Sequence, residues 1–155
     1  MAKVLGFFCN SRLPLSPLIR AVTWGRWSHV ALSLDGGETV YEATGQHGVT
    51  LTPVSALIAR SSEFRVVEID VPDEVVPRLK AEAIKELGKG YDWMGIFGIA
   101  IHRDWQNDQD WWCSEYFATI FQRAGTPLVR AEAVHRVTPQ DIWKLPFPTI
   151  PWSTS

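Results

Sequence analysis

Two short segments, one carrying a histidine and one a cysteine, constrain this chain more than any other feature. Residues 27–32 have the sequence Trp-Ser-His-Val-Ala-Leu, which is typical of a strand that begins near His29. Residues 111–116 have the sequence Trp-Trp-Cys-Ser-Glu-Tyr, and apolar residues with helical spacing follow, so Cys113 falls at the start of a predicted helix. A cysteine nucleophile and a histidine base are the minimum set for thiol chemistry if the fold brings them together.

The segment after His29 predicts a β-hairpin that places a carboxylate beside this histidine. Residues 28–43 contain two candidate strands joined by Asp-Gly-Gly, which is a strong hairpin signal. If the first two of these turn residues form the turn, His29 lies opposite Glu42. If the two glycines form it, Ala31 lies opposite Glu42 and His29 is its diagonal neighbour. In both registers His29 and Glu42 share one face of the sheet, whereas a three-residue loop would separate them.

The start of a helix is a favourable position for a reactive thiol. Unpaired N–H groups and the helix dipole stabilise a thiolate there, and a nearby imidazolium adds to this effect. A lone cysteine is usually a small buried hydrophobe. The neighbouring tryptophans, the helix start and the matching histidine favour a nucleophilic role for Cys113 instead. Its backbone N–H is a candidate oxyanion donor, and Tyr91 and Ser114 are further candidate oxyanion or supporting residues.

His29 is the predicted base, and Glu42 is predicted to orient its imidazole. The main rival is His47, which lies in a Gly-Gln-His-Gly turn close to Glu42 in the sequence. His102 and His135 lie in polar stretches and are expected at the surface.

Composition predicts a single globular domain. The chain has 155 residues, of which 46% are hydrophobic and 21% are charged, and this is enough to bury a substantial core. We expect the domain to span residues 1–145 and a Pro-rich extended tail to span residues 146–155. The net charge is −2 and there is no block of Lys or Arg, so no nucleic-acid partner is expected.

Eight tryptophans exceed what core filling usually requires in a domain of this size. Some of them are therefore expected to line a groove. Four lie near the two key segments and are predicted to form the walls of a substrate cleft: Trp24, Trp27, Trp111 and Trp112.

Cysteine and histidine spacing predicts neither a metal site nor a cofactor. The two cysteines are Cys9 and Cys113, and whether they pair is left open. The amino-terminal apolar run is short for a signal peptide, and no run is long enough to cross a bilayer. The default expectation is a cytoplasmic protein, with leaderless export or release by lysis as open alternatives.

Four short motifs occur in a distinctive order along the chain. They are residues 27–32, Val-Tyr-Glu-Ala at 40–43, Tyr-Asp at 91–92 and Trp-Cys-Ser-Glu at 112–115. This combination resembles the circularly permuted branch of the NlpC-type (papain-like) cysteine peptidase superfamily, over about residues 1–125. In papain-like enzymes the cysteine precedes the histidine, whereas here the histidine comes first. The resemblance implies an α+β fold with a papain-like core, in which an antiparallel sheet packs against helices.

The resemblance also implies a catalytic triad of Cys113, His29 and Glu42, and a covalent acyl-enzyme. We expect a cysteine hydrolase that cleaves an amide bond in a bacterial cell-wall peptide, encoded by a bacterium or a phage. Permuted members that resemble lecithin:retinol acyltransferase act on lipid esters or amides and have a second histidine where this chain has Glu42. That departure favours amide hydrolysis.

Two alternatives to amide hydrolysis remain. One is an acyl-lipid or ester hydrolase or acyltransferase that uses the same triad. The other is a non-catalytic binding module, such as a phage or secretion component. The sequence does not indicate whether an inhibitor protein exists.

Overall fold

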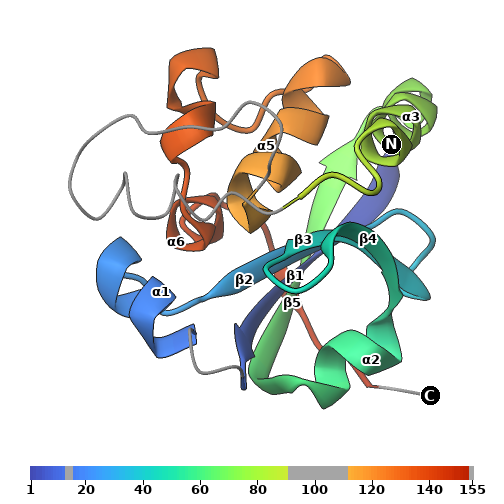
Figure 1. Ribbon diagram of the computed structural model, residues 1–155. Coiled ribbons are helices and arrows are strands. Elements are labelled where there is room, and N and C mark those ends of the chain that lie inside the picture. Colours follow the sequence, from blue (N-terminus) through green and yellow to red (C-terminus); the bar gives the residue numbers. More distant parts are fainter. Residues whose placement is uncertain (13–15, 91–111, 154–155) are drawn as a thin grey trace.

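The computed structural model describes residues 1–12, 16–90 and 112–153, which form a curved antiparallel sheet with helices on both faces (Figure 1). Among these residues, no helix has the length and apolar character needed to span a membrane. The elements in chain order are β1 (Ala2–Ser11), α1 (Ser16–Thr23), β2 (His29–Ser33), β3 (Thr39–Thr44), β4 (Gly48–Pro53), α2 (Val54–Ala59), β5 (Ser61–Val71), the 3-10 helix η1 (Asp73–Val75), α3 (Val76–Lys85), α5 (Cys113–Arg123), the 3-10 helix η2 (Ala131–Arg136), α6 (Pro139–Trp143) and β6 (Thr149–Ile150).

The sheet has the strand order β4-β3-β2-β1-β5-β6, and every pairing is antiparallel. Strand β1 is central and is buried on both faces, as its continuous apolar sequence predicts. It pairs with β2 on one side and along its full length with β5 on the other. The predicted antiparallel sheet packed against helices is confirmed.

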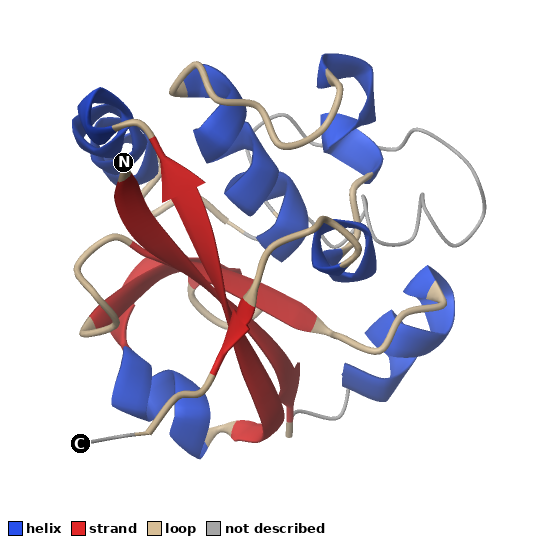
Figure 2. Cartoon of the chain, turned by 180° about the vertical axis from the view of Figure 1, so that it is seen from behind, coloured by secondary structure: helices blue, strands red, loops and turns tan. Residues whose placement is uncertain are grey.

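Apolar side chains form two cores, one on each face of the sheet. Helices α3 and α5 cover one face, where Leu79 and Phe117 belong to the same buried cluster as Val30 and Leu32 of β2. Helix α2 covers the opposite face, where Leu57 packs among apolar residues of β1, β3 and β5. Figure 2 shows from behind how the helices lie on opposite sides of the sheet. The sheet is therefore held between two apolar layers, which fix the strands that carry His29 and Glu42.

The hairpin between β2 and β3 has the second of the two registers predicted from its turn. Leu32 lies opposite Tyr41, which places Ala31 opposite Glu42 and the two glycines at the turn. Gly36 and Gly37 have φ angles of 78° and 98°, a left-handed conformation that side chains other than glycine rarely adopt.

The carboxyl-terminal segment adds an edge strand to the sheet. Strand β6 pairs with Val66 and Val67 of β5. Beyond it, the Trp152 ring packs edge-on against Phe7 with 5.2 Å between the ring centroids. Trp152 also lies over the hairpin turn, because a Cβ added at Gly37 would overlap its ring. The tail is thus attached to the sheet and to the turn between β2 and β3.

Candidate active site

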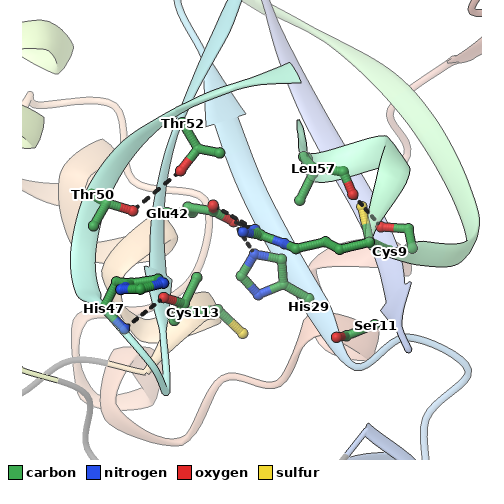
Figure 3. A network of polar contacts seen from close by, with 12 residues as sticks. Cys9, Ser11, His29, Glu42, His47, Thr50, Thr52, Leu57 and Cys113 are labelled. Carbon is green, nitrogen blue, oxygen red and sulfur yellow. Dashed lines mark hydrogen bonds and ion pairs between the residues drawn. The ribbon is translucent and has the colours of Figure 1, made fainter. Parts of the chain in front are cut away.

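His29 is the first residue of β2 and lies directly opposite Cys9 of β1. Residues directly opposite in an antiparallel pair have side chains on the same face, and this is also the face on which Glu42 lies. The imidazole is buried, and its Nε2 atom is 2.6 Å from Oε2 of Glu42 (Figure 3). The predicted proximity of His29 and Glu42 is therefore present in the structure.

Glu42 is fully buried, with none of its surface exposed. Its carboxylate contacts a second cationic group, because Nη2 of Arg60 lies within hydrogen-bonding distance of both Oε1 and Oε2. Burial raises the pKa of Glu42, but His29 and Arg60 more than offset that effect and lower the pKa to about 2. The group is an ionised carboxylate at neutral pH, so it accepts a hydrogen bond from the N–H at Nε2 of His29.

Cys113 is the first residue of α5, and Trp112 precedes it with extended backbone. The Cys113 thiol donates a long hydrogen bond to the carbonyl oxygen of Ser28, with 3.9 Å between Sγ and O. Ser28 is itself fixed, because its N–H donates to Oδ1 of Asn10 at 3.1 Å and to the carbonyl of Cys9 at 3.2 Å. Ser28 immediately precedes His29, so this contact places Sγ of Cys113 beside the first residue of β2.

The Cys113 thiol lies near the imidazole of His29 (Figure 3). Burial lowers the pKa of His29, but contacts with Cys113 and Glu42 outweigh it and raise the pKa to about 9. His29 is therefore predominantly an imidazolium at neutral pH. Because Nε2 of His29 is hydrogen-bonded to Glu42, Nδ1 is the nitrogen that can exchange a proton with Cys113.

The structure also locates the rival histidine. The side chain of His47 is exposed in the turn between β3 and β4, and its backbone N–H donates to Oγ1 of Thr44 at 3.2 Å. The contact with Glu42 is made by His29 and not by His47. His102 lies outside the described residues.

Comparison with known proteins assigns this chain to a protein family. A family model of permuted papain-like amidase enzymes, the YaeF/YiiX or C92 family, matches residues 7–147. This chain belongs to that family. The expectations of a permuted papain-like fold and of a cysteine hydrolase of the amidase type are thereby confirmed.

One solved structure supports the fold of this C92 amidase along its length. The crystal structure of metalloprotein yiiX from Escherichia coli O157:H7, DUF1105, superposes with a TM-score of 0.74. The two chains are 22% identical, and the match covers 96% of each. No curated protein matches the sequence. Within residues 1–12, 16–90 and 112–153 of this chain, no three His, Cys, Asp or Glu side chains form a cluster that could hold a metal ion.

Of the candidate oxyanion or supporting residues of the amidase, the structure describes Ser114 but not Tyr91. The Ser114 hydroxyl is fully buried and donates to the carbonyl of Val137 at 2.7 Å, so this side chain fastens α5 to the segment before α6. Tyr91 and Trp111 lie outside the described residues, and their predicted roles remain predictions.

Trp27 and Trp112, which were predicted to form walls of a substrate cleft, are buried in this structure, and their contact with substrate remains a prediction. Trp27 is 0% exposed, with Trp143 packed edge-on at 5.2 Å between ring centroids and the Arg26 guanidinium 4.6 Å from its own ring centroid. Trp112 is 1% exposed. Both indoles fill space around the ends of β2 and α5, where large apolar surfaces meet. By contrast, Trp24 is 94% exposed, and its predicted place in the cleft remains a prediction.

Sequence reasoning missed two partners. Arg60 follows α2 and is 18 positions from Glu42, so no local pattern connects the two residues. A predicted buried carboxylate needs a countercharge, which is a reason to look for one, but the sequence does not say which arginine supplies it. Likewise, the sequence did not indicate that Glu115, in the first turn of α5, contacts Nδ1 of His135 at 2.8 Å.

Proposed function

We propose that this amidase uses Cys113 as its nucleophile, His29 as its acid and base, and Glu42 as the residue that orients the imidazole. The observation that carries this proposal is the placement of His29, whose Nε2 is held by Glu42 and which also contacts the thiol at the start of α5. Membership of an amidase family supports the reaction type.

The proposed reaction has two steps. The Cys113 thiolate attacks the amide carbonyl carbon, and the C–N bond breaks as the imidazolium of His29 gives its proton to the leaving amine. This leaves a thioester on Cys113. Water then attacks the thioester with His29 accepting its proton, and the carboxylic acid leaves as the thiolate of Cys113 and the imidazolium of His29 are restored. Backbone N–H groups in the first turn of α5 are directed toward the developing oxyanion.

We further propose a bacterial cell-wall peptide as the substrate. The motifs around His29 and Cys113 resemble those of a superfamily that includes peptidoglycan endopeptidases and amidases. The ionised Glu42, in place of the second histidine of the lipid-acting members, also favours an amide substrate.

The test is incubation with purified muropeptides, with mass spectrometry of the products. Wild type is expected to release a new amine and a new carboxylic acid, whereas Cys113→Ala is expected to release neither. Cys9→Ala is the matched control, because it removes the other buried thiol and should retain cleavage. Cleavage of acyl esters but not of any muropeptide would replace the cell-wall proposal with the ester one. Full amide cleavage by Cys113→Ala would overturn the triad.

A further inference from the structure

The contact between Arg60 and Glu42 lies beside the proposed proton-transfer path but outside the triad. Nη2 of Arg60 contacts both oxygens of the Glu42 carboxylate, and one of these oxygens, Oε2, is also the partner of His29. Glu42 is therefore fixed from two sides. Its carboxylate cannot rotate away from the imidazole without breaking a contact with the guanidinium.

The backbone of Arg60 is anchored on both sides of its Cα atom. Its N–H donates to the carbonyl of Ala56 at 3.3 Å, which ends α2, and its carbonyl accepts from the N–H of Arg12 at 2.9 Å. The side chain thus extends from a defined point toward the face of the sheet that carries Glu42. About a third of the Arg60 side chain remains exposed (34%), so water still solvates part of the guanidinium and lowers the free-energy cost of burying its charge.

The need for a second cation follows from the burial of Glu42. An ionised carboxylate with no exposed surface is costly unless it is paired and hydrogen-bonded. His29 alone supplies that pairing only while it is protonated, and catalysis requires it to lose and regain its proton. Arg60 keeps its charge throughout, because a guanidinium does not deprotonate in proteins. The carboxylate therefore stays paired when the imidazole is neutral.

We infer that Arg60 is a positioning residue of the active site, which keeps Glu42 ionised and oriented toward Nε2 of His29 throughout the reaction. This inference rests on the proposed triad. Among the described residues, the titratable and charged groups that interact with Glu42 or with its partner His29 are Cys9 of β1, His29 of β2, Cys113 of α5 and Arg60 itself. Opposite Glu42 on β4 lies Thr50, which has no charge. Of these groups only Arg60 is a permanent cation.

The experiment measures the rate of Cys113 alkylation by iodoacetamide against pH, with peptide mass spectrometry to separate it from Cys9. For Arg60→Gln we expect a fall of about tenfold at neutral pH, the lower end of what removing a group that orients a histidine costs. The acid limb of the rate should also move to higher pH, because Glu42 becomes easier to protonate. Arg60→Lys retains the charge and should keep the acid limb near that of wild type.

A double variant tests whether Arg60 acts through Glu42. If it does, Arg60→Gln should add little to the effect of Glu42→Gln, since residues that act through one contact are not additive. Arg65→Gln is the matched control, because Arg65 is a surface arginine of the adjacent strand β5 and should behave as wild type.

Three outcomes separate the hypotheses. A wild-type acid limb in Arg60→Gln, with only a loss of thermal stability, would overturn the positioning role and leave a structural one. Multiplying effects in the double variant would overturn action through Glu42. If His29→Ala itself leaves the alkylation profile unchanged, the proposed triad fails, which is distinguishable from failure of the Arg60 inference alone.

Discussion

Cys9 and His29 lie directly opposite each other on β1 and β2, so a second thiol shares the face of the sheet on which the proposed base lies. Both cysteines of the chain are free thiols. Burial raises the pKa of Cys9 to about 12, and the nearby Glu42 carboxylate contributes in the same direction. The fold thus keeps this sulfur protonated although it lies beside the site.

Cys9 should resist alkylation in the folded protein. At about pH 8 its thiolate fraction is very small, and the side chain is buried, so iodoacetamide should modify it only after unfolding in urea. Peptide mass spectrometry of native and urea-treated samples measures this directly. Equal rates of Cys9 modification in the two samples would contradict the expectation.

The ion pair of His29 and Glu42 should make the free energy of unfolding depend on pH in both the acidic and the alkaline range. The Glu42 contribution is present above about pH 4.5 and is lost as pH falls toward the folded pKa of about 2. The His29 contribution is present below about pH 6.5 and is lost as pH rises through about 9. Urea unfolding across this range should show that Glu42→Gln flattens the wild-type profile, by on the order of 2 kcal/mol. A variant with the same profile as wild type would show that the pair is not coupled to folding.

The two turn glycines should differ in their tolerance of alanine. Gly36→Ala places a Cβ in open space, so it should cost only the left-handed strain of about 1–2 kcal/mol. Gly37→Ala carries the same strain and must also displace the Trp152 ring, which adds about 1–3 kcal/mol. Urea unfolding of both variants measures the difference. In a Trp152→Ala background that difference should vanish; if it persists, the ring is not the cause.

The helix that carries Cys113 is fastened to α3 by a buried hydroxyl. The Tyr116 hydroxyl donates to the carbonyl of Ala83 at 2.9 Å, and burial raises the pKa of Tyr116 above its usual value. Tyr116→Phe should therefore lower the free energy of unfolding by about 1 kcal/mol, measured by urea denaturation. An unchanged free energy of unfolding would mean that the hydrogen bond is replaced or contributes nothing net.

Local patterns were sufficient to predict the hairpin half of the site. Turn chemistry limited the register to two choices, and side-chain alternation placed His29 and Glu42 on one face in either of them. The start of α5 at Cys113 followed in the same way from apolar spacing. These features depend on residues that are close in sequence.

Contacts between residues far apart in the sequence could not be predicted from such patterns. Arg60 contacts Glu42 because α2 packs on the face of the sheet on which the Glu42 side chain lies. No periodicity in the sequence indicates this contact. The burial of Trp27 was missed for a related reason. Its neighbour Trp143 comes from the opposite end of the chain, so an indole expected in a groove lies in the core.

The division of the site between a hairpin and a distant helix has a consequence for the cell that makes this protein. Synthesis proceeds from the amino terminus, so the ribosome has added His29, Glu42 and Arg60 long before it adds Cys113. His29, its carboxylate partner Glu42 and the arginine that pairs with this carboxylate can therefore assemble on a nascent chain that still lacks Cys113. A growing or prematurely terminated chain that ends before α5 therefore lacks the proposed nucleophile, and the thiol meets the imidazole only after α5 has packed against β2.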